Sequence, residues 1–177
     1  MRRYQLDTAL VLVDAEDREI GSADKLECHV GDGLLHRAFS VFVYGPDGRV
    51  LLQQRSAAKP LWPMYWSNAC CGHPLPGEDV SAAAELRTHE ELGISCQARF
   101  LYKFIYQARY SAGYSENELC HVFESRFDGE LAPDPAEIAA WRWIAPDELT
   151  QEIERHPERF TPWIKLEWAQ IRRRANN

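Results

Sequence analysis

The sequence predicts an α+β fold, an α/β/α sandwich in which helices flank a mixed sheet, and three observations lead to this class. Short apolar segments bounded by turn residues recur along the chain, as is typical of strands. The segment 81–92 has the alanines and the following glycine of a helix. Two prolines, Pro146 and Pro162, stand where further helices can begin. Strands on both sides of a central helix favour helices packed on a mixed sheet.

The N-terminal half is predicted to consist of strands joined by turns and loops. The polar segment Lys25–Gly33 contains two glycines and is expected to be a loop. The expected elements are a strand at Leu6–Val13 with a turn at 14–18, a β-hairpin of Phe39–Tyr44 and Arg49–Gln54 around Gly45-Pro46-Asp47-Gly48, and an ordered loop at Ser56–Trp66.

The C-terminal half begins with the clearest helix of the chain, Ser81–Leu92. Ser81 is expected to cap its start, and Gly93 to end it. After it we expect strands at Arg99–Tyr106, Glu118–Phe127 and Trp141–Ile144, a turn at Ser111–Ser115, and helices at 146–154 and 162–173.

Composition limits the class of protein. A chain of 177 residues with 45% apolar residues can bury the core of one domain, which we expect to span residues 1–177. Charged residues at 27% and aromatic residues at 11% argue against disorder. A net charge of -7 gives no support to nucleic-acid binding. A small anionic ligand would need local Lys and Arg side chains and bound cations.

The cysteines and the N-terminus bear on location. Five cysteines are an odd number without a C-x-x-C pair, which favours reduced thiols and a cytoplasmic protein. The apolar run Thr8–Val13 is too short for a signal peptide, and no run approaches the length of a membrane helix. We therefore expect no membrane insertion; a monomer and a homodimer both stay open.

A glycine-to-glutamate spacing is the strongest motif. Gly72 is followed after five residues by Glu78, and the segment closes with Glu90-Glu91-Leu92-Gly93-Ile94. This is the spacing of a Nudix box (72–94), a loop-helix-loop that holds a metal against a diphosphate. Where the hydrolytic form has Arg-Glu, this chain has Leu86-Arg87. The change indicates a site that holds a diphosphate more than it cleaves one.

Side chains in and near the box suit a metal and a phosphate. Arg87 and Glu91, four residues apart on the helix, can offer a bidentate phosphate contact and a magnesium ligand. Outside the box, an isolated pair of this kind would be a surface ion pair. Glu90 is expected to face solvent.

Histidines and a cysteine are the second group of candidates. Three imidazoles, His29, His36 and His73, with Glu116 and Glu118 on one side of a strand, could form a site for manganese, magnesium or zinc. Spacing alone favours unrelated surface residues over such a site. Cys71 lies beside Gly72, where a nearby cation would favour its thiolate and proton transfer. Its neighbour Cys70 is assigned to packing.

Aromatic residues could complete a site for an apolar ligand. Trp62, Trp66, Tyr106, Trp163 and Trp168 are ordinarily core or rim residues. Beside a diphosphate site they would suit an isoprenoid tail, and an indole face could stabilise a transient carbocation.

Together these motifs resemble the type I isopentenyl-diphosphate isomerases of the Nudix superfamily, from about Leu10 to Trp168. The resemblance rests on the order of several segments. They are His29 and His36 before Arg37-Ala38-Phe39-Ser40, Arg55 with Lys59, Trp62-Pro63, Asn68-Ala69-Cys70-Cys71-Gly72-His73-Pro74, the altered box, Glu116-Asn117-Glu118 and Thr161-Pro162-Trp163.

The resemblance implies an interconversion of isopentenyl and dimethylallyl diphosphate by protonation and deprotonation. It implies Cys71 as a catalytic cysteine, Glu118 as the acid opposite it, and Tyr106 beside Glu118. The remaining implied roles fall into three sets. They are a metal cage of His29, His36, His73, Glu116 and Glu118; a second magnesium at Glu91 and the carbonyl of Cys71; and substrate contacts from Lys25, Arg55, Lys59, Arg87 and Trp163.

Two other functions remain alternatives. A Nudix pyrophosphohydrolase of a nucleoside or prenyl diphosphate is disfavoured by Arg87 at a carboxylate position. A non-catalytic diphosphate-binding module is disfavoured by the full set of acid, base and metal candidates. The types of ligand in the cage do not determine which of these metals it binds.

Overall fold

The computed structural model describes residues 8–175, and all the strands it describes belong to one nine-stranded sheet. The strands are β1 (Ala9–Val13), β2 (Glu19–Asp24), β3 (His36–Tyr44), β4 (Val50–Arg55), β5 (Trp66–Ser67), β6 (Cys70–Gly72), β7 (Arg99–Arg109), β8 (Ser115–Arg126) and β9 (Ile138–Ile144). The helices are α1 (Lys25–His29), α2 (Val80–Leu92), α3 (Pro146–Arg155), the 3-10 turn η1 (Pro157–Arg159) and α4 (Pro162–Ala175).

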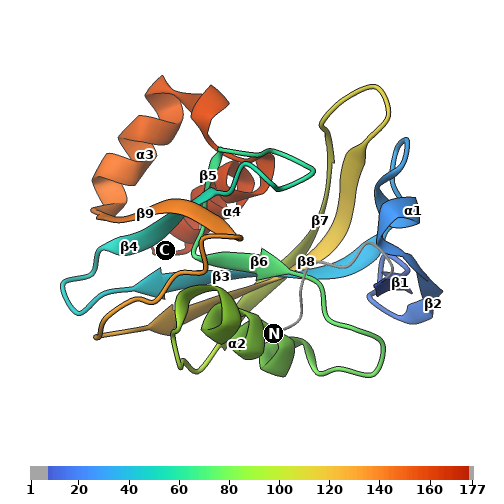
Figure 1. The fold of residues 1–177 in the computed structure, drawn as a ribbon, viewed down its shortest axis with the longest axis horizontal. Helices are drawn as coiled ribbons and strands as arrows, with labels where there is room; N and C mark the ends of the chain where they lie inside the picture. Colours follow the sequence, from blue (N-terminus) through green and yellow to red (C-terminus); the bar gives the residue numbers. More distant parts are fainter. Residues whose placement is uncertain (1–7, 176–177) are drawn as a thin grey trace.

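Strand β3 is the centre of the sheet. It pairs with β8 in parallel over its whole length and with β6 in antiparallel fashion. β7 and β8 form a long hairpin that rises on the right of Figure 1. The sheet is therefore mixed, as predicted.

The predicted hairpin of Phe39–Tyr44 and Arg49–Gln54 is correct only at its turn. The two strands pair at one position, Tyr44 with Val50. Beyond it they separate, because β4 takes β9 as its main partner. Two sheet regions thus diverge from one turn, and the space between them is open to side chains of other elements.

Alternation along β3 divides the core into two clusters. Ala38 and Phe42 pack with α3 and α4, whereas Phe39 and Val41 pack with α2. Figure 1 shows α2 on one side of the sheet and α3 with α4 on the other. The predicted arrangement of helices on both faces of a sheet is confirmed.

Helix α2 begins one residue earlier than predicted, and its cap differs. Asp79, not Ser81, is the N-cap residue, since its side chain accepts a hydrogen bond from the Ala82 amide at 3.0 Å. Asp79 also accepts the hydroxyl of Ser81. Gly93 ends the helix in the left-handed region at φ 71°, as expected.

Two expectations near the N-terminus need correction. The predicted loop Lys25–Gly33 contains the short helix α1, followed by turns. Strand β2, which pairs with β1, was not predicted, because its exposed and polar residues lack strand periodicity. Of the predicted strand Leu6–Val13, the first two residues lie outside the described part of the chain.

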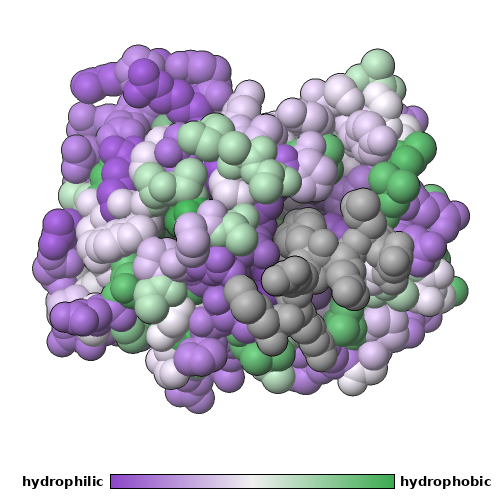
Figure 2. Space-filling model, in the orientation of Figure 1, coloured by the Kyte–Doolittle hydropathy of each residue, from purple (hydrophilic) through white to green (hydrophobic). Residues whose placement is uncertain are grey.

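The other predicted elements are confirmed with shifted ends. The segment 56–66 is irregular until β5 begins, and the strands β7, β8 and β9 are longer than expected. Hydrophilic residues gather over α3, at the upper left of Figure 2. Within residues 8–175, no helix is both long and apolar enough to cross a membrane.

Candidate active site

One pocket collects most of the predicted site residues. It is built where β3, β4, β6, β7, β8 and α4 meet. Its lining consists of Ser40, Arg55, Cys71, Gly72, His73, Tyr106, Glu116, Glu118 and Trp163. Seven of these nine are residues that the sequence singled out for chemistry.

Four ligating side chains gather beside this pocket, and we call them the imidazole cluster: His29, His36, His73 and Glu116. One ligand atom from each lies within 4.8 Å of the others. Backbone carbonyls hold two of the rings, since Nδ1 of His29 is 2.6 Å from Lys25 O and Nδ1 of His36 is 2.8 Å from Leu34 O. These contacts leave the Nε2 atoms directed at a shared centre.

The donor set fits a divalent cation. Nε2 of His36 is buried and has no hydrogen-bond partner in the described chain. Oε2 of Glu116 lies 2.9 Å from Nε2 of His29 but also lacks an aligned donor. Unpaired buried polar atoms are costly, and a cation bound by imidazole and carboxylate would satisfy both.

Burial sets the protonation of the imidazoles. It lowers the pKa of His36 to about 4, and it holds the pKa of His73 well below its usual value, so both rings offer free lone pairs. Burial also disfavours the charged form of His29, but the neighbouring Glu116 carboxylate outweighs it and raises that pKa to about 9.

Glu118 lies next to the imidazole cluster and joins it to Tyr106. Its Oε1 is 2.9 Å from Nε2 of His73, and its Oε2 accepts the Tyr106 hydroxyl at 2.6 Å. Its distance to Nε2 of His36 is 3.8 Å. Glu116 and Glu118 lie on the same side of β8, as their spacing predicted. The mutually close ligand set contains Glu116 and not Glu118.

The predicted thiolate of Cys71 depends on a nearby cation, and the chain's own side chains do not favour it. Burial raises the pKa of its thiol to about 12, and the opposing influence of Arg55 and Lys59 is too weak to reverse this. With the chain's own residues, Cys71 is therefore a neutral thiol that carries a proton. Cys70 is fully buried among apolar side chains, in agreement with a packing role.

Trp163 and Arg55 form one wall of the pocket. The indole Nε1 donates to Ser67 Oγ at 2.9 Å, and the Arg55 guanidinium lies 5.2 Å from the ring centroid. Arg55 also donates to the carbonyls of Leu61 and Trp62. Both side chains are therefore held in place before any ligand binds.

The other predicted phosphate-binding and magnesium residues lie outside the pocket lining. Lys59 pairs with Glu137, and Arg87 pairs with Glu91 at 2.6 Å and reaches Glu137 at 3.7 Å. We call Lys59, Arg87, Glu91 and Glu137 the ion-pair cluster. The remaining one, Lys25, opens α1.

Glu90 does not face solvent as expected. Its carboxylate pairs with Arg87 at 2.6 Å, and its side chain is only 18% exposed. Arg87 lies three residues earlier on the same helix, α2, so its guanidinium can hold the Glu90 carboxylate against the helix surface.

Sequence reasoning missed three residues of this region. Glu137 precedes β9 and supplies a partner for both cations of the ion-pair cluster. Ser40 lines the pocket, and Glu167 lies behind it on α4. For Glu167 a signal existed, because it follows Trp163 by four residues on a helix face that is otherwise apolar.

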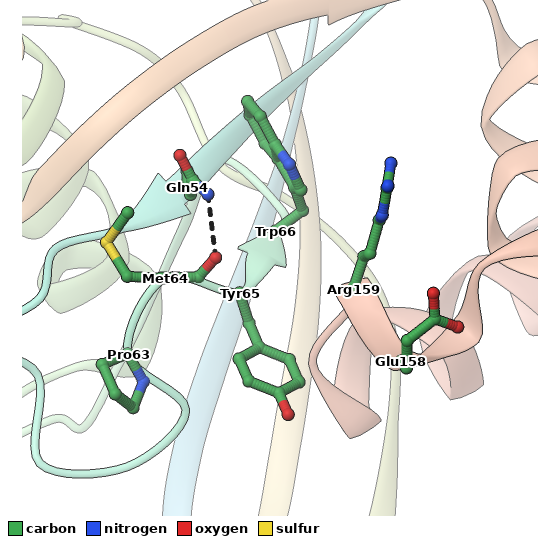
Figure 3. A pocket seen from close by; sticks show the side chains of 7 residues that line it. All are labelled: Gln54, Pro63, Met64, Tyr65, Trp66, Glu158 and Arg159. Carbon is green, nitrogen blue, oxygen red and sulfur yellow. Dashed lines mark hydrogen bonds between the residues drawn. The ribbon is translucent and has the colours of Figure 1, made fainter.

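A second hollow shares no lining residue with the pocket described above (Figure 3). It is lined by Gln54, Pro63, Met64, Tyr65, Trp66, Glu158 and Arg159, and Nε2 of Gln54 donates to the Met64 carbonyl at 2.9 Å. None of the predicted catalytic or metal-binding residues is among them. The site chemistry therefore belongs to the first pocket.

Solved structures show the same fold. A protein from Deinococcus radiodurans superposes with a TM-score of 0.67 and 21% identity, over 82% of this chain and 88% of that one. A MutT protein from Methanosarcina mazei Go1 gives a TM-score of 0.66 and 14% identity, over 81% and 96%. At these identities the likeness concerns the fold alone, and it agrees with the predicted Nudix-like architecture.

Sequence comparison defines the family more closely. Residues 34–164 match the NUDIX domain model. The isopentenyl-diphosphate Delta-isomerase of Burkholderia multivorans is 45% identical over 159 residues, which is 90% of this chain and 90% of that protein. The enzyme of the same name from Nocardia farcinica is 45% identical over 154 residues, 86% and 88% of the two chains. The chain therefore belongs to the NUDIX superfamily and, within it, to the isopentenyl-diphosphate Delta-isomerase family.

Proposed function

We propose that the protein interconverts isopentenyl diphosphate and dimethylallyl diphosphate, the reaction named for its relatives. One observation carries this proposal: Cys71 and Glu118, a thiol and a carboxyl group, line the same pocket beside the imidazole cluster. Two proton-transfer groups around one small cavity suit a reaction that adds a proton to an alkene and removes another.

The proton balance assigns a task to each group. From isopentenyl to dimethylallyl diphosphate, the terminal alkene carbon gains a proton from one group and the neighbouring CH₂ loses one to the other. The diphosphate is unchanged. We propose Glu118 and Cys71 for these tasks on opposite faces of the alkene, with their roles exchanged in the reverse direction.

Neighbouring side chains support this assignment. The Tyr106 hydroxyl donates to Glu118 and can hold that carboxyl group in one orientation. Cys71 is half-buried, and desolvation raises the pKa of its thiol, so the thiol keeps a proton at neutral pH. The indole of Trp163 could stabilise a transient cation by about 2 kcal/mol when water is excluded.

Divalent cations are proposed at two places. His29, His36, His73, Glu116 and Glu118 would hold Mn²⁺, Mg²⁺ or Zn²⁺, and Glu91 with the Cys71 carbonyl would hold Mg²⁺. A bound cation supplies positive charge that neutralises the diphosphate and polarises its ligands. Lys25, Arg55, Lys59 and Arg87 are the proposed diphosphate contacts.

Two variants test the proposed function directly. Cys71→Ala and Glu118→Gln should each lower kcat by several orders of magnitude, because each removes one of two proton-transfer groups. Isomerisation is followed by product analysis, and in D2O the product should take up deuterium. The matched control is Cys96→Ala, a half-buried thiol outside the pocket, which should keep wild-type turnover.

Two results would reject the isomerase. Near-normal turnover by either variant would remove its residue from the mechanism. Release of phosphate or pyrophosphate by the wild type, without isomerised product, would instead identify a pyrophosphohydrolase.

Three wider expectations are also proposals. A single domain over residues 1–177 is supported by the one sheet that all described strands share. A cytoplasmic location is supported by five cysteines that are all free. A monomer or a homodimer is compatible with the site, since the pocket is lined by residues of one chain.

A further inference from the structure

Glu167 is a buried acid on the helix that forms one wall of the pocket. Its side chain is 0% exposed. It follows Trp163 by four residues on α4, so both side chains lie on the same helix face, and Trp163 lines the pocket. The other buried residues of this face, Ile164 and Trp168, are apolar. A carboxyl group therefore stands directly behind the pocket.

Two polar side chains meet this carboxyl group. Sγ of Cys120 lies 3.5 Å from Oε1 of Glu167 and 3.6 Å from Oγ of Ser40. Cys120 thus lies between the Ser40 hydroxyl and the Glu167 carboxyl, and Ser40 acts to lower the pKa of that carboxyl. The other oxygen, Oε2, has no partner in the described chain. The Tyr102 hydroxyl donates to the Glu167 backbone carbonyl at 3.0 Å and fixes this turn of the helix.

Ser40 connects this buried group to the reaction site. It is the direct cross-strand partner of Cys71 in the pairing of β3 with β6. Ser40 and Cys71 both line the pocket. Opposite side chains on one face of an antiparallel pair have Cβ atoms about 5 Å apart. Glu167 is therefore connected to the neighbourhood of Cys71 through the Cys120 thiol and the Ser40 hydroxyl.

Burying the carboxyl group of Glu167 costs free energy, which indicates a functional role for this residue. Burial raises its pKa to about 8, against the influence of Ser40 and Cys120, so it is largely a neutral acid at neutral pH. A neutral acid has one donor and further acceptor capacity. Packing alone would be served by an apolar residue of similar size without the cost of burying a polar group.

We propose that Glu167 is a positioning residue for the isomerisation: it holds the Ser40 hydroxyl in one orientation beside Cys71. This inference rests on the proposed function. An oriented hydroxyl dipole at the pocket wall acts on charge that develops at the alkene. Glu167 itself does not line the pocket, so it has no direct part in binding the diphosphate. Loss of Glu167 should therefore lower kcat and leave KM nearly unchanged.

The test compares Glu167→Met, which fills the space without hydrogen bonding, with Glu167→Gln, which keeps a donor and an acceptor. We expect Glu167→Met to lower kcat about tenfold with KM within threefold, and Glu167→Gln to restore most of the loss. Leu166→Gln, an exposed change on the same helix, is the matched control and should behave as wild type. Circular dichroism and thermal melting establish that each variant is folded.

A double-mutant cycle separates positioning from packing. In a Ser40→Ala background, Glu167→Met should change kcat less than twofold, because the group through which it acts is absent. An equal loss in both backgrounds, or a kcat for Glu167→Met within twofold of wild type, would overturn the inference. Should Glu167→Met fail to fold, Ser40→Ala alone decides, and wild-type kcat in Ser40→Ala overturns it. A wild type without isomerase activity would instead refute the proposed function.

Discussion

Two groups of buried side chains border Cys71, and they differ in how their charges are balanced. In the imidazole cluster, Nε2 of His36 and an oxygen of Glu116 have no hydrogen-bond partner in the described chain. In the ion-pair cluster, the carboxylates of Glu91 and Glu137 lie against Arg87 and Lys59. Both are within electrostatic reach of Cys71, through Glu91 and Lys59 on one side and Glu118 on the other.

The difference teaches what each cluster needs. The imidazole cluster could be completed by a bound cation, since two of its ligand atoms have no hydrogen-bond partner among the described residues. In the ion-pair cluster, each carboxylate already lies against a cationic side chain, so the proposed magnesium ion at Glu91 would compete with Arg87, and the proposed diphosphate at Arg87 would compete with Glu91.

The largest effect is expected from breaking the imidazole cluster. His36→Ala removes a proposed metal ligand, and we expect it to lose bound metal and to lower turnover by more than the roughly 10–100-fold cost of changing a residue that only supports a ligand. Metal content by elemental analysis and isomerase turnover check this. A chelator should produce the same loss in the wild type.

His121→Ala is the matched control for His36→Ala. This histidine bonds to Asp17 at 2.8 Å, away from the cluster, so the variant should keep its metal. Full metal content in His36→Ala would show that the buried imidazole is not a ligand.

A somewhat smaller effect is expected from the ion-pair cluster, and it concerns folding. Glu137→Gln leaves the buried ammonium of Lys59 and the guanidinium of Arg87 without this carboxylate. We expect a loss of about 3 kcal/mol in the free energy of unfolding, because the variant breaks a buried ion pair. Urea denaturation measures it.

The control for Glu137→Gln is Glu124→Gln, which breaks an exposed pair with Arg99. It should cost less than about 1 kcal/mol. Equal losses in the two variants would mean that burial does not distinguish these ion pairs. Metal binding at the imidazole cluster should survive in Glu137→Gln, which would sharpen the contrast between the clusters.

The two clusters also differ in how far sequence could predict them. The box spacing placed Glu91 and Arg87 on one helix face, and their contact follows from local geometry. Their partner Glu137 lies outside the box, and Lys59 is 78 residues away from it, so no local pattern joins them. His36 meets Glu118 because β3 and β8 pair in parallel, a non-local choice that periodicity does not encode.

The same limit explains the missed elements. α1 has five residues and no side-chain cap, too little pattern to distinguish it from a loop. Strong local signals, in contrast, located α2 to within one residue and α4 to within two. The candidate site was therefore predictable in its residue types, whereas its geometry depended on strand pairing.

The smallest effect on the free energy of unfolding is expected from Glu167, a carboxyl group that belongs to neither cluster. Among residues 8–175, Glu167 has neither an ion-pair partner nor a place in a group of metal ligands, and burial raises its pKa from 4.5 to about 8. Between these values the folded protein keeps a proton that the unfolded chain releases. Its contribution to stability is thus greatest below pH 4.5, falls as pH rises, and levels off above pH 8. We expect Glu167→Gln to remove this slope and to gain on the order of 2 kcal/mol over wild type between about pH 5 and about pH 6.5.

Urea denaturation of both proteins across this range measures the difference, and the comparison cancels the histidines, which titrate in both. Two titratable neighbours of Glu167, Cys120 and Tyr102, keep their protons over most of the range, because burial keeps their pKa values above the usual ones. A difference between wild type and Glu167→Gln that is constant with pH would mean that Glu167 does not take up its proton on folding. If the difference in the free energy of unfolding grows with pH, Glu167 is a buried acid that stays neutral. It would then differ from the imidazole cluster, in which two ligand atoms have no hydrogen-bond partner among the described residues, and from the ion-pair cluster, in which opposite charges pair.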